Sequence, residues 1–108
     1  MLKMIIYEIN MTVDKEAESD FREWLPNHIR EILALVGFQS AEIFTRQADG
    51  NEDGETKWLC TVQYRLVNQA ALDDYFQNKA AEMRKDGTAR FGGRFTATRR
   101  ILQHEGSF

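Results

Sequence analysis

The sequence has few of the features that would place the protein in a membrane, in a disulfide-rich class or on nucleic acid. Its only cysteine is Cys60, so no disulfide forms within the chain, and a cytoplasmic location is expected. The longest apolar run, residues 32–38, is far shorter than the roughly 20 residues that span a bilayer. Basic residues are not in excess, because 14 Lys and Arg stand against 17 Asp and Glu. Neither a membrane nor a nucleic acid is therefore predicted as a partner.

What the chain does have is enough apolar material for one core. Of its 108 residues 43% are hydrophobic, and they include seven Phe, three Tyr and two Trp. A chain of this length buries a core without metals or disulfides, but it is too short for two independent domains. The sequence predicts a single domain over residues 1–108.

The first half of the chain shows a change from strand to helix periodicity. Residues 4–12 alternate between apolar and polar positions, which predicts a strand. From Asp14 to Gly37 the apolar residues recur at helical spacing, which predicts an amphipathic helix. The only proline, Pro26, falls inside this helix and predicts a kink near residues 22–26, because proline lacks the N–H and clashes with the preceding turn.

Two further strands are expected at residues 38–47 and 57–66, joined by an exposed acidic loop. The loop spacing Asp49-x-Asn51-x-Asp53 matches the first half of a calcium loop. The twelfth position, which requires a bidentate Glu, is Cys60, and the flanking segments are strands. An ordinary hairpin turn is therefore the better interpretation, and no metal site is predicted.

The last third of the chain predicts a helix from Asn68 to about Gly87, a turn or short helical extension over 88–93, and a strand over 94–103. The resulting order is β-α-β-β-α-β. This order is typical of an α+β, ferredoxin-like fold, with a four-stranded antiparallel sheet and two helices on one face.

Alternation along each expected strand separates the two faces of this sheet. Tyr7, Trp58 and Tyr64 fall on the helix-facing side, where packing in the core is the favoured role, although stacking on a flat ligand is an alternative. The opposite side is mixed, as expected of a surface that meets a partner or a wet cavity. Its expected members are Glu8, Asn10, Glu42, Phe44, Arg46, Leu59, Thr61, Gln63, Arg65, Arg94, Thr96, Thr98 and Arg100.

Several motifs resemble the dimeric α/β-barrel superfamily, in which two ferredoxin-like protomers pack sheet to sheet. The motifs are Phe21-x-x-Trp24-x-x-x-His28, the run Leu35-Val36-Gly37-Phe38, and Tyr64. Residues 4–8, 90–95 and 99–102 are more closely similar to a family of small uncharacterised bacterial proteins in that superfamily, classed as a domain of unknown function.

The resemblance implies a homodimer in which two copies complete the ligand site, and it leaves the activity open, because one fold supports many functions. The expected function is that of an uncharacterised small-molecule-binding or structural protein. The alternative is a cofactor-independent monooxygenase or isomerase acting on a small cyclic or aromatic substrate. A module that binds another protein is a third hypothesis. Haem-degrading members use a histidine of the second helix, and residues 68–87 contain none. No cofactor is therefore expected.

Four residues are candidate site residues. His28 is the candidate acid or base, since an imidazole exchanges protons near neutral pH. Trp24, one helical turn away, is a candidate for stacking on a ligand. Arg65 and Arg100 are candidates for binding an anionic group. The alternatives are a packing role for His28 and ion pairs between copies of the chain for the two arginines.

Overall fold

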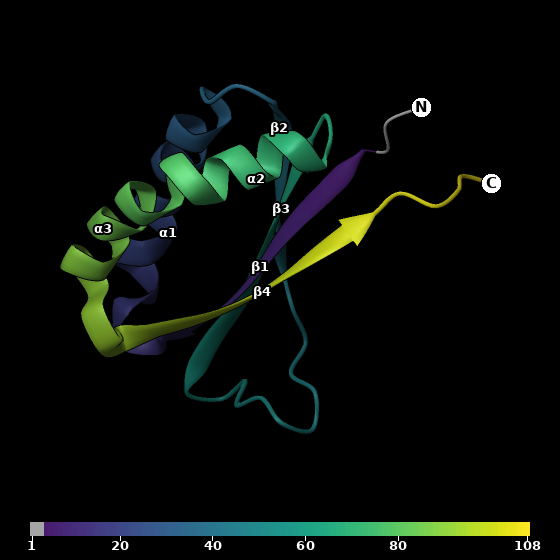
Figure 1. The fold of residues 1–108 in the computed structure, drawn as a ribbon. Helices are drawn as coiled ribbons and strands as arrows, with labels where there is room; N and C mark the ends of the chain where they lie inside the picture. Colours follow the sequence, from purple (N-terminus) through teal and green to yellow (C-terminus); the bar gives the residue numbers. More distant parts are fainter. Residues whose placement is uncertain (1–3) are drawn as a thin grey trace.

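The computed structural model describes residues 4–108 as one four-stranded sheet with three α-helices on one side (Figure 1). The sheet order is β2-β3-β1-β4, and every neighbouring pair is antiparallel. This confirms the predicted α+β, ferredoxin-like class. The elements are β1 (Ile5–Asp14), α1 (Lys15–Leu33), β2 (Phe38–Thr45), β3 (Lys57–Leu66), α2 (Gln69–Asn78), α3 (Ala80–Phe91), a 3-10 helix (Gly92–Arg94) and β4 (Phe95–Gln103).

The register of the sheet fixes which residues share a face. Ile9 of β1 lies opposite Val62 of β3 and Arg99 of β4, and Asn10 lies opposite Thr61 and Thr98. The first set lies on the helix-covered face, and the second lies on what we call the open face, which carries no helix within residues 4–108. As predicted, Tyr7, Trp58 and Tyr64 belong to the core or pack against it.

Helix α1 runs through Pro26 as one helix. Its buried residues recur at the spacing predicted from the sequence: Ala17, Phe21, Leu25, Ile29 and Ile32. Asp14, which precedes it, makes no side-chain capping hydrogen bond and instead forms an ion pair with Lys57. The helix is held to the sheet by its apolar stripe, since a helix in water derives most of its stability from such packing.

The predicted second helix is divided into α2 and α3 at Lys79, whose backbone angles of φ −131° and ψ −31° are not helical. Its start was predicted correctly, because the Asn68 side chain accepts a hydrogen bond of 2.9 Å from the Ala71 N–H. The bend leaves both Tyr75 and Ala80 buried. Helix α3 also continues beyond Gly87 to Phe91 and is followed by a 3-10 turn, so the second of the two alternatives for residues 88–93, a short helical extension, is the one observed.

Gly37 lies where α1 returns to the sheet, and its backbone requires glycine. Its φ is +91°, a left-handed conformation, and a Cβ placed there would lie 2.4 Å from the Ala71 Cβ. Within the described residues, none of the helices has the length and apolar character needed to cross a membrane.

Candidate functional site

A cavity of about 340 Å³ lies between the helix-covered face and helices α1 and α3. We call it the helix–sheet cavity. Most of its wall is apolar or aromatic, which is usual for sites that bind small molecules. It is lined by Ile9, Met11, Phe21, Trp24, Leu25, His28, Val62, Tyr64, Met83, Arg84, Gly87, Thr88, Gly92, Phe95, Ala97 and Arg99.

Trp24 and His28 form one wall of this cavity. Their rings are stacked, with centroids 4.5 Å apart and planes inclined by 20°. The Trp24 indole Nε1–H donates a hydrogen bond of 2.7 Å to Oδ2 of Asp86, which fixes the indole between α1 and α3. Gly87 allows this approach, because a Cβ there would lie 3.0 Å from the Trp24 ring. The aromatic wall is thus positioned by contacts with two helices.

The imidazole of His28 is held in its neutral form. Burial lowers the pKa of His28 below its usual value of 6.5, and the charges of Glu31 and Asp86 oppose this shift only in part. His28 and Trp24 also line a polar groove of about 570 Å³ on the outer side of the helices. An imidazole between an apolar cavity and a wet groove can accept a proton from a ligand and pass it to water.

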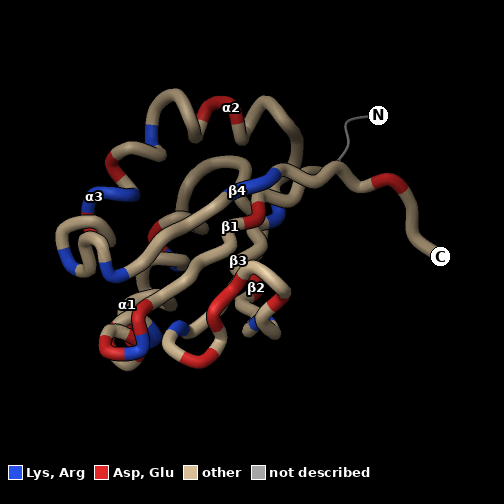
Figure 2. Tube along the Cα trace, turned by 90° about the horizontal axis from the view of Figure 1, so that it is seen from below, with Lys and Arg blue, Asp and Glu red and all other residues tan. Residues whose placement is uncertain are grey.

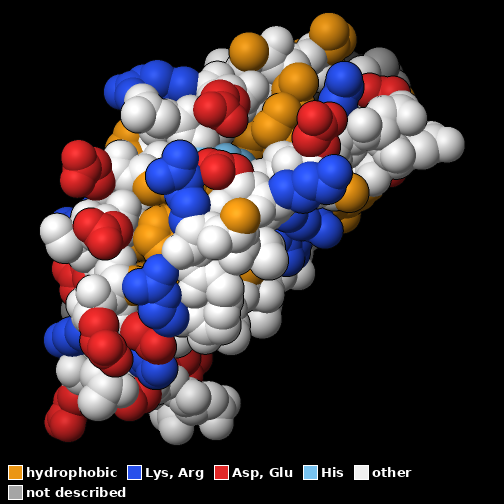
Figure 3. Space-filling view, turned by 90° about the vertical axis from the view of Figure 1, so that its left-hand side faces the viewer, with side chains coloured by type: hydrophobic (Ala, Val, Ile, Leu, Met, Phe, Trp, Pro, Cys, Tyr) orange, Lys and Arg blue, Asp and Glu red, His pale blue; other side chains and the backbone are white. Residues whose placement is uncertain are grey.

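The outer surface over α1 and α3 carries alternating acidic and basic side chains with hydrophobic ones between them (Figure 3). Asp86 belongs to this surface and also contacts the cavity wall through Trp24. Its pKa is lowered, chiefly by the hydrogen bond from Trp24 and then by Arg90. Asp86 is therefore a carboxylate at neutral pH and a strong acceptor for the indole.

Two arginines at the cavity were not predicted as site residues. Arg84 extends from α3 and Arg99 from β4, and both line the helix–sheet cavity. Basic segments of both elements are visible in Figure 2. Arg99 directly precedes Arg100 in the predicted strand, so alternation puts it on the helix-facing side, and this was a usable signal. The position of Arg84 depends on how α3 crosses the sheet, and periodicity does not reveal this.

Of the four predicted site residues, the structure brings Trp24 and His28 together and places Arg65 and Arg100 elsewhere. Arg100 lies on the open face, where its Nε donates to the Glu8 carboxylate. Arg65 follows the same alternation and contacts the Met4 sulfur. Neither arginine lines the helix–sheet cavity. Residues of one copy line this cavity, and the expectation that two copies complete the ligand site stays a prediction.

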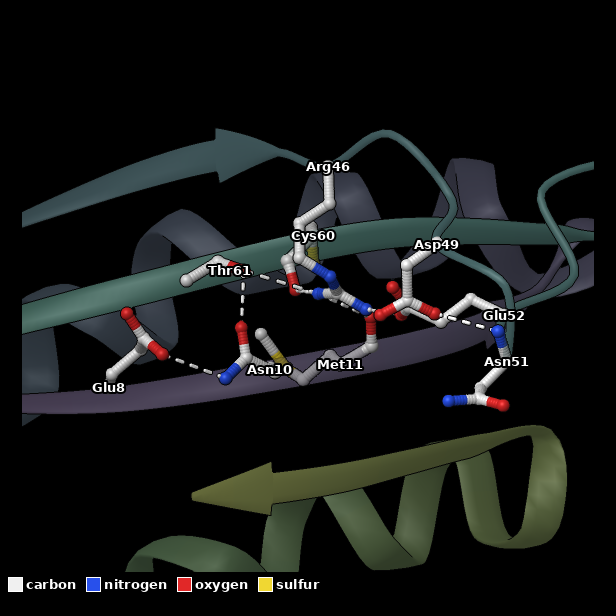
Figure 4. A network of polar contacts seen from close by, with 9 residues as sticks. All are labelled: Glu8, Asn10, Met11, Arg46, Asp49, Asn51, Glu52, Cys60 and Thr61. Atoms are coloured by element: carbon white, nitrogen blue, oxygen red, sulfur yellow. Dashed lines mark hydrogen bonds and ion pairs between the residues drawn. The ribbon is translucent and has the colours of Figure 1, made fainter. Parts of the chain in front are cut away.

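The open face has its own polar network (Figure 4). At its centre is Glu8, only 3% exposed, which accepts hydrogen bonds from Asn10, Gln63 and Arg100. Burial opposes ionisation of this carboxyl, but these hydrogen bonds outweigh it and hold the pKa of Glu8 below its usual value of 4.5. Asn10 in turn accepts a hydrogen bond of 2.6 Å from the Thr61 hydroxyl.

Arg46 ties the loop between β2 and β3 to this network (Figure 4). Its guanidinium donates to the backbone carbonyls of Met11 and Cys60 and forms an ion pair with Glu52 of the loop. A polar hollow of about 440 Å³ lies beside it, lined in part by Asn10, Arg46, Thr98 and Arg100. The open face therefore has a hollow of its own, but with a polar wall.

The loop acids and the cysteine have structural explanations. Asp49 accepts a hydrogen bond from the Asn51 N–H, and Asp53 accepts from the N–H groups of Glu55 and Thr56, as in ordinary turns. Cys60 is buried, and burial raises the pKa of its thiol to about 12. A thiol that stays protonated is a poor nucleophile.

Comparison with solved structures finds proteins of similar fold, among them a cofactor-independent oxygenase and a conserved protein. SnoaB, a cofactor-independent oxygenase from Streptomyces nogalater, is 8% identical, with a TM-score of 0.63 over 95% of each chain. A conserved protein from Methanosarcina mazei is 12% identical, with a TM-score of 0.63 over 94% of each chain. An ethyl tert-butyl ether d family protein from Bacillus halodurans is 14% identical, with a TM-score of 0.63 over 94% of this chain and 99% of the other. At such identities the likeness concerns the fold alone.

No curated protein matches the sequence. A family model does match, and it covers residues 4–105, nearly the whole chain and every element of the sheet. The chain therefore belongs to the family described as domain of unknown function DUF4286.

Proposed function

We propose that the protein binds a small, flat and largely apolar molecule in the helix–sheet cavity. The observation that carries this proposal is the cavity itself, about 340 Å³ in volume and walled by aromatic and aliphatic side chains. The indole of Trp24 is positioned by Asp86 and stacked on His28, so one wall is a fixed planar surface. Flat apolar ligands bind well to preorganised surfaces of this kind, because little side-chain freedom is lost.

The two tryptophans provide a matched test. Trp24 lines the cavity, whereas Trp58 packs against Phe21 and under Arg22 and does not line it. We expect the fluorescent probe N-phenyl-1-naphthylamine to bind saturably to the wild-type protein. Trp24→Phe should weaken binding by about 3- to 10-fold through lost stacking, and Trp58→Phe should leave it within about 2-fold. Equal effects of the two substitutions would contradict the proposal.

A second candidate function is cofactor-independent oxygenation or isomerisation of a cyclic substrate, with His28 as the base. It is favoured by the neutral imidazole at the cavity wall and by the likeness in fold to SnoaB. The base would accept a proton from an acidic C–H or O–H of the bound ring.

Oxygen uptake with 1,8-dihydroxyanthrone, which has an acidic methylene group, tests this second candidate. We expect uptake above the buffer rate, loss of that uptake in His28→Ala, and no loss in His104→Ala. His104 is a suitable control because it follows β4 and does not line the cavity. If His28→Ala turns over as fast as the wild type, the base role is excluded.

We also propose that the protein is a homodimer whose open faces pack together. Phe44 is 43% exposed there, beside the polar network around Glu8, and an interface commonly combines apolar and polar groups in this way. Four strands do not close a barrel, so a second sheet is the natural cover.

Light scattering should give twice the chain mass, and Phe44→Glu should shift the protein to monomer. Val36→Glu, at an exposed apolar residue outside the sheet, should not. A wild-type monomer at high concentration would contradict the dimer.

A further inference from the structure

Building on the proposed binding role of the helix–sheet cavity, we propose that its ligand carries a carboxylate, which Arg84 and Arg99 bind. The ligand class is then a planar, apolar molecule with one acidic group. The starting observation is the charge of the cavity wall. Its described lining residues include two arginines and neither Asp nor Glu, although the whole chain has a net charge of −3.

The partners of the two arginines also set them apart from four of the other arginines. Arg22, Arg46, Arg90 and Arg100 each form an ion pair with a carboxylate. Among residues 4–108, neither Arg84 nor Arg99 forms such a pair. The guanidinium of Arg84 donates one hydrogen bond of 3.3 Å to the Tyr7 hydroxyl and keeps further N–H groups for a ligand. Among the described lining residues the cavity thus has two cationic side chains and no acidic one, which favours an anionic ligand.

The arginines approach the cavity from two elements. Arg99 lies opposite Ile9 on the helix-covered face of β4, and Arg84 extends from α3. Both charges act on Tyr75, and burial nevertheless raises the pKa of that phenol to about 12. Burial also raises the pKa of Tyr64, which lines the cavity. The phenols therefore stay neutral at physiological pH and do not neutralise the arginines.

The chemistry of the remaining wall defines the rest of the ligand. A guanidinium is planar and binds a carboxylate through two parallel N–H donors, which orients the acid as well as attracting it. Trp24, Met83 and Phe95 contribute aromatic and thioether surface to the same cavity. A ring system bearing one carboxylate meets both kinds of surface, with the acid at the arginines and the ring against the apolar wall.

The test compares 2-naphthoate with 2-naphthamide, which share the ring system and differ in charge, by calorimetric titration of the full chain. We expect the wild type to bind naphthoate at least about 10-fold more tightly, the increment of one charge-assisted hydrogen bond. Arg84→Gln and Arg99→Gln should each remove most of that preference and leave naphthamide binding unchanged. Both side chains are exposed, so neither substitution should prevent folding, and circular dichroism checks this.

Lys85→Gln is the matched control, since it removes one positive charge from α3 at a residue that does not line the cavity. It should retain the preference. Equal binding of the two compounds by the wild type would overturn the proposal that the ligand carries a carboxylate, but it would leave the proposed binding role of the cavity intact. Binding of neither compound would overturn both. A loss in Lys85→Gln as large as in Arg84→Gln would also overturn the proposal, because it would reflect general charge rather than the two arginines.

Discussion

The helix-covered face and the open face consist of alternate residues of the same strands, yet they form very different surroundings. Tyr7, Val62 and Tyr64 are buried under the helices by apolar contacts and line or adjoin a cavity. On the other side Glu8 is just as inaccessible, but it is held by hydrogen bonds from Asn10, Gln63 and Arg100. One face thus resembles a core with a site in it, and the other resembles half of a wet interface.

This difference separates the two proposals. The proposed ligand site lies in the helix–sheet cavity, which Trp24 and His28 of one copy line. The proposed pairing with a second copy uses the open face. Substitutions on one face should therefore affect ligand binding, and substitutions on the other should affect the assembly and the acid sensitivity of the fold.

The largest expected effect is on the helix-covered face. Phe21 is 0% exposed and contacts the rings of Trp24, Trp58, Phe91 and Phe95. Phe21→Ala should lower the free energy of unfolding by about 3–5 kcal/mol, because it removes buried apolar surface and leaves a void. Urea unfolding measures this change. Val36→Ala, at a residue 93% exposed, should alter it by less than about 0.5 kcal/mol.

A smaller, pH-dependent effect is expected on the open face. Glu8 accepts three hydrogen bonds, and in Glu8→Gln the amide N–H₂ would lie next to one of the donors. We therefore expect the substitution to lower the free energy of unfolding by about 1 kcal/mol at pH 7. The folded-state pKa of Glu8 lies below 4.5. Ionised Glu8 therefore stabilises the fold above pH 4.5, and this stabilisation is lost as the pH falls through the lower pKa. The wild type and the variant should converge in acid when unfolding is followed by urea titration between pH 3 and 7. A constant difference would exclude this role of Glu8.

The smallest expected effect is on the pKa of His28 in the cavity wall. Burial lowers the pKa of His28, and the charge of Asp86 partly restores it. Nuclear magnetic resonance titration of the His28 ring should give a midpoint below 6.5, and Asp86→Asn should lower the midpoint further. Since the folded-state pKa is depressed, neutral His28 stabilises the fold above pH 6.5 and the contribution is lost as the pH falls. A midpoint above 6.5 would mean that the ring is not buried against Trp24.

The strands and their faces were predictable because period-2 alternation depends only on local sequence, and the register confirms it at Tyr7 and Tyr64. The break at Lys79 was not predictable from its neighbours. Residues 76–82 contain no proline or glycine, and the bend arises where Tyr75 and Ala80 both pack into the core. Local propensity was overridden there by tertiary packing.

The site was only partly predictable for a similar reason. The spacing of Trp24 and His28, one helical turn apart, places them on the same side of a helix, and this can be inferred from sequence. The cavity opposite them depends on how α3 crosses the sheet, which also decides that Arg84 lies at its wall. Arg65 and Arg100 were correctly assigned to the open face, and their role in binding an anionic group stays a prediction.

The most direct test of this account is to locate a ligand by nuclear magnetic resonance on the full-length chain titrated with 2-naphthoate. The Trp24 indole N–H and the Met83 methyl group report on the helix–sheet cavity, whereas the methyl groups of Thr61 and Thr98 report on the open face. We predict saturable shifts of Trp24 and Met83, with Trp58, Thr61 and Thr98 nearly unchanged. Shifts confined to Thr61 and Thr98 would place the ligand on the open face and contradict the central claim.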